Sequence, residues 1–320
     1  MTALPDTPIC IDLPGLIRLQ ADARALRLPG AQQVRTRQSG LQASPRRGRG
    51  MAFAEVRQYQ PGDDIRSIDW RVTARRQTPH TKLYEEERER PVLLICDFNR
   101  TLFFGSQGAY KQVRCAQLAA LIAWLGLWAG DQIGGIVFSE QGIVVIRPAR
   151  RKKSVLRLLD TLAQFQHGPD TLQQTAGKDT GSGPPASVDL DGALQEARRV
   201  AHTGSRIFVI SDFLGVSDET SGLLGALARH NTVTALRVVD PLEQSLPSQG
   251  RFAVAGPDGP VWFNGSDRRF QRAFAAKVRE HEDTIKRCFK TAQVAAFPVI
   301  TGDDPAQSLR GILGPRGRIG

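Results

Sequence analysis

Apolar residues along this chain follow two patterns, short continuous runs and rows with helical spacing. The short runs lie at 92–96, 133–138, 207–210, 233–239 and 294–300. Continuous apolar runs of this length are typical of strands that are covered on both faces of a parallel sheet. Between them, apolar positions with a period of about 3.6 residues predict helices, most clearly at 113–128. This alternation predicts an α/β fold with a doubly wound, mostly parallel sheet.

Turn residues divide the remaining segments into hairpins and further helices. Gln141-Gly142 predicts one hairpin, and Gly256-Pro257-Asp258-Gly259 predicts a second one near 250–264. Additional helices are expected at 16–26, 154–165, 190–201, 223–228 and 270–289, with a last helix starting at Asp304-Pro305. The Gly- and Pro-rich stretch 168–185 is expected to form a loop.

Three segments are expected along the chain. Residues 1–50 hold a short N-terminal helix and a basic loop, residues 51–90 form a small β appendage, and residues 91–315 form the main α/β domain. The basic loop carries five arginines among Gly, Ser and Pro, namely Arg35, Arg37, Arg46, Arg47 and Arg49. This composition favours a solvated loop over a dedicated phosphate-binding arm.

Composition and net charge indicate a folded protein that binds acidic partners. Of the 320 residues 41% are hydrophobic, which supports a packed core, and the formal net charge of +11 favours acidic partners. Among acidic partners, which include nucleic acid, anionic lipid and acidic protein surfaces, nucleic acid ranks low, because aromatic residues make up only 7% and no stacking motif lies among the arginines. No apolar run approaches the roughly 18 residues of a membrane span, and the N-terminus lacks a signal-peptide pattern, so we expect a cytoplasmic protein.

Oxygen-bearing side chains gather where two of the predicted strands end. Asp97, Asn99 and Thr101 follow the strand at 92–96, and Asp212 follows the strand at 207–210. Ligands are expected beyond the carboxyl ends of the strands in such a sheet. Carboxylate, amide and hydroxyl oxygens are the ligands that Mg²⁺ takes, with water completing an octahedron. The four residues are therefore candidate ligands for Mg²⁺.

These motifs resemble two related families. Asp97-x-Asn99-x-Thr101 together with Ser211-Asp212 is similar to the metal-ion-dependent adhesion site of von Willebrand factor type A domains, in a degenerate form. The usual serines are replaced, and Val188, at the place of the middle-loop threonine, has no ligating atom. The upstream segment resembles the signature of the "domain of unknown function 58" family in Tyr59, Asp63, Arg66, Asp69, Trp70 and Arg75. This resemblance extends from about residue 53 to residue 313.

The resemblance implies a role in protein assembly. Members of that family are similar to type A domains and commonly accompany MoxR-type AAA+ ATPases. The expected function is a non-enzymatic adaptor that works with such an ATPase to assemble or activate a client protein complex. The six upstream residues are the candidate partner-binding surface, although their alternating charges are also compatible with an internal ion-pair network.

Two other functions stay open from the sequence. Asp97-x-Asn99-x-Thr101 also resembles the first motif of haloacid-dehalogenase-type phosphatases, in which the first Asp attacks phosphorus. Asn99 stands at the position of the second acid and cannot transfer a proton. The positive charge also allows a basic nucleic-acid-binding protein, which would bind in a salt-dependent manner.

Overall fold

The computed structural model describes residues 8–26, 51–61, 63, 65–86, 91–168, 188–256 and 259–314. The chain forms two compact units, one of residues Gly30–Glu89 and one that combines Met1–Pro29 with Arg90–Gly320. Each unit is described by itself below. Within the described residues, no helix combines the length and the apolar character needed to cross a membrane.

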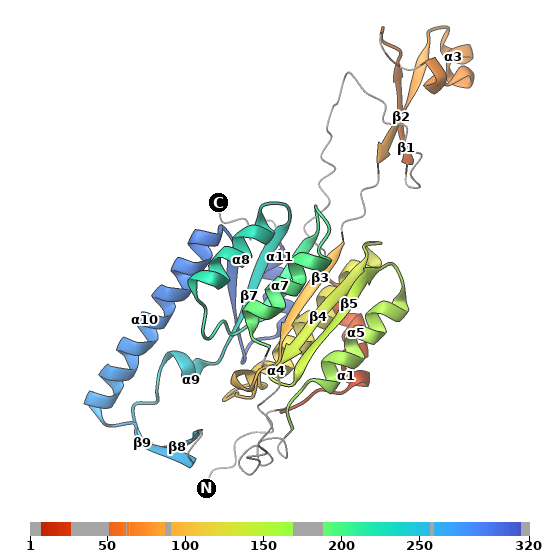
Figure 1. Cartoon of the computed structure of the whole chain (residues 1–320). Helices are drawn as coiled ribbons and strands as arrows, with labels where there is room; N and C mark the ends of the chain where they lie inside the picture. The colour runs from red at the N-terminus through yellow and green to blue at the C-terminus, as the bar shows by residue number, and fades with distance from the viewer. Residues whose placement is uncertain are drawn as a thin grey trace. The chain divides into compact units, whose positions relative to one another are not determined.

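A six-stranded sheet forms the centre of the larger unit (Figure 1). Its spatial order is β10 (Ala295–Ile300), β7 (Thr232–Val239), β6 (Arg206–Ser211), β3 (Val92–Asp97), β4 (Ile133–Ser139) and β5 (Gly142–Ala149). Neighbouring strands are parallel except for the hairpin of β4 and β5, which the sequence predicts. The doubly wound, mostly parallel sheet is therefore confirmed.

Helices cover both faces of this sheet. One layer contains α4 (Lys111–Trp128), α5 (Lys152–Gln164) and α11 (Pro305–Leu313), and the other contains α7 (Leu190–Val200), α8 (Asp218–Ala228) and α10 (Arg268–Ala292). Along β3, Val92, Leu94 and Cys96 face the first layer, while Leu93 and Ile95 face the second. Helix α4 is buried along nearly its whole circumference, because α1, α2 and α11 pack on it from outside.

The N-terminal helix is part of this larger unit. It is predicted as one helix but forms two, α1 (Leu13–Arg18) and α2 (Gln20–Arg24), separated at Leu19. Leu16 is completely buried, and its carbonyl accepts a hydrogen bond of 3.2 Å from Trp124 Nε1. The predicted basic loop and most of the predicted loop 168–185 lie outside the described residues.

Several predicted helices differ from the structure in length. Helix α8 begins at Asp218, five residues before the predicted start, because Ser217 and Thr220 form a capping box there. The first turn of this helix is polar, so a pattern of apolar residues does not reveal it. The second predicted hairpin is formed by β8 (Arg251–Gly256) and β9 (Gly259–Asn264), which pair antiparallel. A short helix that the sequence pattern does not predict, α9 (Pro241–Gln244), follows β7.

The smaller unit is built on an antiparallel pair, β1 (Met51–Gln58) and β2 (His80–Glu86). The connection between these strands contains the 3₁₀ turn η1 (Ile65–Ser67) and α3 (Trp70–Arg76). Asp69 caps α3 by accepting hydrogen bonds from the backbone N–H groups of Arg71 and Val72. The helix ends at Gln77, whose backbone is left-handed with φ 55°.

Candidate functional site at the carboxyl edge of the sheet

Asp97 ends β3 with a side chain that is almost completely buried. Its Oδ1 accepts a hydrogen bond of 2.9 Å from the backbone N–H of Asn99, and its Oδ2 accepts one of 2.6 Å from Ser211 Oγ. Burial, followed by the Asp212 carboxylate, raises the pKa of Asp97 to about 7, although the hydrogen bonds from Ser211 and Asn99 act to lower it. Both oxygens of Asp97 are thus engaged within the protein.

Asp212 follows β6, beside β3 in the sheet. Its side chain is also buried; Oδ1 accepts from the backbone N–H of Leu214 at 3.1 Å, and Oδ2 accepts from Lys111 Nζ at 2.9 Å. The next residue, Phe213, has φ 56°, a conformation that L-residues rarely adopt. Its ring is buried and meets Phe289 edge to face at 4.9 Å, so packing against α10 holds this turn in shape.

Lys111 brings a cation to this edge of the sheet, and the sequence pattern gives no signal for it. It is the first residue of α4, its side chain is fully buried, and its Nζ lies 2.9 Å from Asp212 Oδ2 and 2.5 Å from Glu243 Oε1. Burial acts to lower the pKa of Lys111, but the carboxylates of Asp212 and Glu243 outweigh it and raise the pKa. A buried ammonium therefore sits between two carboxylates.

Asp240, directly after β7, is a further acid at this edge that the sequence pattern does not indicate. It is fully buried and accepts hydrogen bonds from Ser106 Oγ (2.5 Å), Ser106 N (2.7 Å), Thr301 Oγ1 (2.7 Å) and Leu242 N (3.0 Å). Burial alone would raise the pKa of Asp240, but these hydrogen bonds lower it overall. Asp240 therefore ties the segment before α4 to the end of β10.

Asn99 and Thr101 are placed differently from the two aspartates. Asn99 is half-buried, and its Oδ1, shielded from solvent, accepts no hydrogen bond within the described part of the chain. Thr101 is exposed on the 3₁₀ turn η2 (Arg100–Leu102). The preceding Arg100 donates its backbone N–H to Glu140 Oε1 at 2.6 Å. Of the four predicted ligands, Asp97 ends β3 and Asp212 follows the adjacent strand β6, Asn99 contacts Asp97 through its backbone N–H, and Thr101 is exposed.

The arrangement can be tested for its fit to a divalent cation. A magnesium ion needs oxygen ligands at about 2.0–2.1 Å in an octahedron. Here Lys111 Nζ donates a hydrogen bond to Asp212 Oδ2, and Ser211 Oγ donates one to Asp97 Oδ2. Among the described residues, no group of three or more Asp, Glu, His or Cys side chains could hold a metal ion. With Lys111 and Ser211 bonded to them, the carboxylates of Asp212 and Asp97 do not fit the ion that a type A adhesion site implies.

The six predicted partner-binding residues divide into internal and exposed ones. Asp63 accepts from Arg57 Nη2 at 2.6 Å and from the backbone N–H of Gln60 at 3.0 Å, and Tyr59 donates its hydroxyl to the carbonyl of Asp63. Asp69 caps α3. Trp70, in contrast, is 68% exposed, and the side chains of Arg66 and Arg75 are exposed as well.

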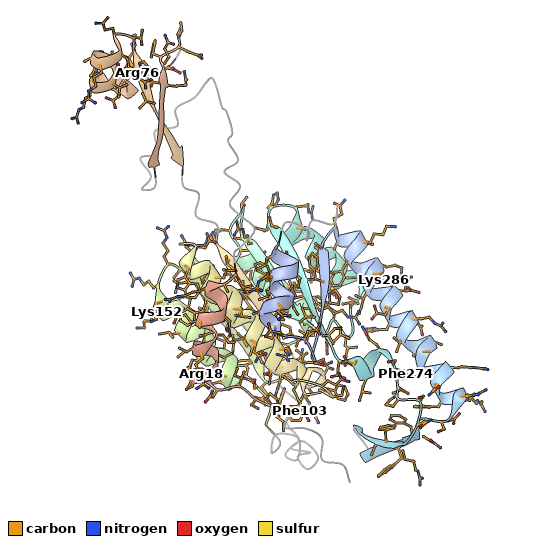
Figure 2. All side chains as sticks on the ribbon, turned by 180° about the vertical axis from the view of Figure 1, so that it is seen from behind. Arg18, Arg76, Phe103, Lys152, Phe274 and Lys286 are labelled. Carbon is orange, nitrogen blue, oxygen red and sulfur yellow. The ribbon has the colours of Figure 1, made fainter. Side chains whose placement is uncertain are left out.

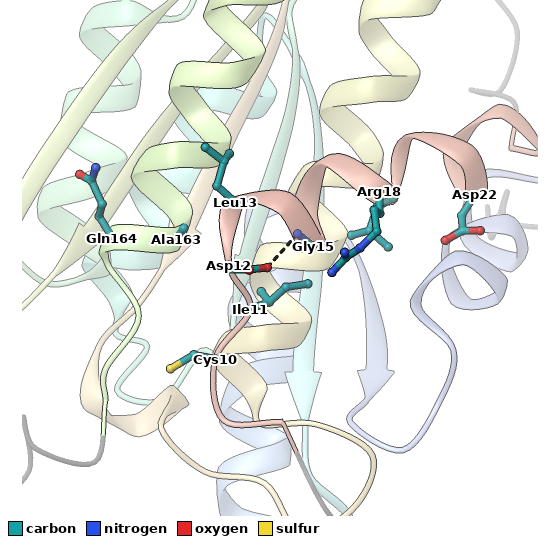
Figure 3. Close-up of a pocket in the computed structure, with 10 residues that line it drawn as sticks. Cys10, Ile11, Asp12, Leu13, Gly15, Arg18, Asp22, Ala163 and Gln164 are labelled. Carbon is teal, nitrogen blue, oxygen red and sulfur yellow. Dashed lines mark hydrogen bonds between the residues drawn. The ribbon is translucent and has the colours of Figure 1, made fainter.

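A shallow groove lies elsewhere on the larger unit (Figure 3). It has a volume of about 820 Å³ and runs between the segment around α1 and the end of α5. Cys10, Asp12, Arg18 and Gln164 are among its lining residues, and Asp12 Oδ1 is occupied by the backbone N–H of Gly15. None of the predicted ligands lines it, so this groove is separate from the strand-end carboxylates.

Comparison with known proteins identifies relatives of the chain. The family described as "Protein of unknown function DUF58" matches residues 55–284. Uncharacterized proteins of Mycobacterium bovis (Mb1516) and Mycobacterium tuberculosis (Rv1480) are 31% identical over 246 residues, which cover 76% of this chain and 72% of each relative.

Two solved structures resemble parts of the chain at low identity. The conserved hypothetical protein BatB from Bacteroides thetaiotaomicron has a TM-score of 0.42 and 12% identity over 72% of this chain and 99% of its own. An aerotolerance-related membrane protein from Bacteroides fragilis has a TM-score of 0.41 and 13% identity over 70% of this chain and 96% of its own.

Proposed function

The chain belongs to the DUF58 family, and on that premise we propose that it is a non-enzymatic adaptor that binds a MoxR-type AAA+ ATPase and a client protein complex. The observation that carries this proposal is an exposed surface on the smaller unit, which we call the α3 surface. It consists of Ile65, Trp70, Arg71, Arg75 and Arg76. Trp70 is 68% exposed and Ile65 is 64% exposed, and the side chain of Arg76 stands out from α3 (Figure 2).

The composition of the α3 surface supports a protein partner. Trp and Arg are the residues most enriched among those that dominate binding energy at protein interfaces. The acidic neighbours Asp63 and Asp69 are used inside the unit, one with Arg57 and one as the cap of α3. The exposed charges left on α3 are therefore arginines, which favour an acidic face on the ATPase.

The carboxyl edge of the sheet supports a role without catalysis. Asp97 is 3% exposed and accepts hydrogen bonds on both oxygens, and Asp212 is paired with Lys111. A carboxylate that attacks phosphorus must be able to reach its substrate. The proposal therefore assigns no phosphatase activity to Asp97. It places the adaptor in the cytoplasm, where unpaired thiols such as the four of this chain are usual.

A binding measurement between purified partners tests the proposal. The full chain is captured on a MoxR-type ATPase from the same organism, with ATP present, and the ATPase rate is followed. Trp70→Ala and Arg75→Glu are expected to reduce binding at least about tenfold, which corresponds to about 1.4 kcal/mol. Trp262→Ala and Arg198→Glu are matched controls, because Trp262 is 67% exposed on β9 and Arg198 is exposed on α7.

Three results would overturn the proposal. They are no association and no change in ATPase rate, turnover of an aryl phosphate that is lost in Asp97→Asn, and salt-dependent nucleic-acid binding at physiological ionic strength. Equal losses in the α3 variants and in their controls would also show that the α3 surface is not the contact.

A further inference from the structure

We propose that Lys111 takes the place of a metal ion at the carboxyl edge of the sheet. Its ammonium is a built-in counter-ion for Asp212 and Glu243, so that these two carboxylates are compensated without a divalent cation. The inference rests on the geometry of the larger unit and does not depend on the ATPase partnership. It predicts that the stability of the protein does not depend on Mg²⁺, because Lys111 already pairs with Asp212, one of the four predicted ligands.

The position of Lys111 in its helix is the first argument. It opens α4, and the N-terminus of a helix carries a partial positive charge that disfavours a lysine. The first turn of α4 contains no acidic residue, and Tyr110 provides no side-chain cap. The negative charges that stabilise the Lys111 ammonium come from other elements, from Asp212 after β6 and from Glu243 on α9. The ion pairs with these two carboxylates thus explain why a lysine is found at this position.

Burial gives the second argument. The Lys111 side chain has no exposed surface and that of Asp212 is 4% exposed. Removing one partner from a buried ion pair is strongly destabilising, because the other charge stays buried and unpaired. The buried Asp212 carboxylate therefore requires a counter-charge, whereas the Glu243 side chain is 31% exposed. Lys111 provides this charge from within the chain, at hydrogen-bonding distance from both carboxylates.

The capping box of α9 fixes the geometry of the acceptor. Glu243 offers Oε1 to Lys111 and accepts the backbone N–H of Asp240 on Oε2 at 3.0 Å. Asp240 is in turn held by Ser106 and Thr301. The hydrogen bonds to Lys111 and to the backbone of Asp240 therefore fix the orientation of the Glu243 carboxylate. A divalent ion and an ammonium cannot share this position, because like charges repel strongly at such short distances.

The inference predicts that shortening Lys111 converts the edge into a cation site. In Lys111→Ala the carboxylates of Asp212 and Glu243 lose their counter-ion, and the volume of the lysine side chain becomes available to an ion and its waters. The full chain is titrated with Mn²⁺ and with Mg²⁺ by calorimetry, and its thermal midpoint is measured with each ion and with EDTA. The unaltered protein is expected to show neither binding heat nor a shift of its midpoint.

For Lys111→Ala we expect a midpoint below that of the unaltered protein in EDTA, and a partial recovery when Mn²⁺ or Mg²⁺ is added. Its affinity for Mn²⁺ should exceed that of the unaltered protein at least about tenfold, or about 1.4 kcal/mol. Lys111→Ala combined with Asp212→Asn should lose this gain. Lys152→Ala is the matched control, because Lys152 opens α5 in the same way but is exposed (Figure 2); it should change nothing.

Two outcomes would overturn the inference. One is a Mg²⁺ or Mn²⁺ response of the unaltered protein that Asp212→Asn abolishes, which would mean that an ion displaces Lys111. The other is a folded Lys111→Ala protein without any gain in cation binding. The first measurement needs no variant at Lys111, so the inference can fail even if Lys111→Ala does not fold. Neither outcome is affected by whether the ATPase binds.

Discussion

Ser211 Oγ donates a hydrogen bond of 2.6 Å to Asp97 Oδ2 and thereby links the carboxyl ends of the adjacent strands β6 and β3. The acceptor is a buried acid whose pKa is raised from its ordinary 3.8 to about 7, first by burial and then by the Asp212 carboxylate. An acid with a higher pKa in the folded protein binds more protons when folded. The free energy of unfolding therefore falls as the pH rises from about 4 to about 7.

Asp97→Asn should remove this pH dependence. The asparagine keeps an oxygen for the backbone N–H of Asn99 and can donate its amide to Ser211 Oγ. Above pH 7 we expect the variant to be more stable than the unaltered protein by a few kcal/mol, since one pKa unit corresponds to about 1.4 kcal/mol. Urea denaturation across this pH range measures it, with the exposed Asp160→Asn as the control. Parallel pH profiles for the variant and the unaltered protein would contradict the assignment.

Asp240→Ala should destabilise the larger unit far more than the loss of an ordinary helix cap. Asp240 is buried and satisfies donors from Ser106, Thr301 and Leu242, and each buried donor left unpaired costs about 1–3 kcal/mol. Asp189, the exposed cap of α7, serves only the N–H of Gly192 among the described contacts, and its loss should cost about 1 kcal/mol. Comparable costs for the two alanine variants in chemical denaturation would refute this reading.

Gly108→Ala should disturb the loop that precedes α4. Gly108 has φ 69°, and an added Cβ would lie 2.5 Å from the carbonyl oxygen of Thr301. Gly215 has a similar φ of 81°, but an added Cβ there would meet no other atom. Gly215→Ala therefore measures the stability lost through backbone strain alone, about 1–2 kcal/mol. The Gly108 variant should lose clearly more stability in thermal unfolding. An equal loss in both variants would mean that the loop can move away from Thr301 without cost.

Leu16→Ala should destabilise the α/β unit although residue 16 lies far from the sheet strands in sequence. Leu16 is fully buried against α4, and such truncations cost about 2–5 kcal/mol. Leu214→Ala, at a residue that is 46% exposed, should change the unfolding free energy little. If the Leu16 variant unfolds like the unaltered protein, the N-terminal helix contributes no stability to the larger unit.

The apolar pattern by itself determined the sheet. The five predicted apolar runs agree with β3, β4, β6, β7 and β10 to within one residue at each end. Burial on both faces of β3, β4 and β6 requires apolar residues at nearly every position, which is visible locally in the chain, whereas the edge strand β10 is apolar but largely exposed. The same pattern placed Asp97 and Asp212 at strand ends, because the apolar run stops there, although both side chains are buried.

Polar first turns and helix breaks were harder to predict. The start of α8 rests on the capping box of Ser217 and Thr220, and the break at Leu19 separates helices whose apolar spacing is continuous. The spacing of apolar residues carries no information about either the capping box or the break at Leu19.

Only the tertiary structure decided how the strand-end acids are compensated. Lys111 lies 101 residues from Asp212 and 132 residues from Glu243 along the chain, and a lysine at the start of a helix normally reaches into solvent. Its burial follows from the packing of α4 between the sheet and the outer helices, which no local pattern specifies. The sequence thus placed Asp97 and Asp212 at this edge, and the fold decided that Asp212 and Glu243 share an ammonium of the chain itself.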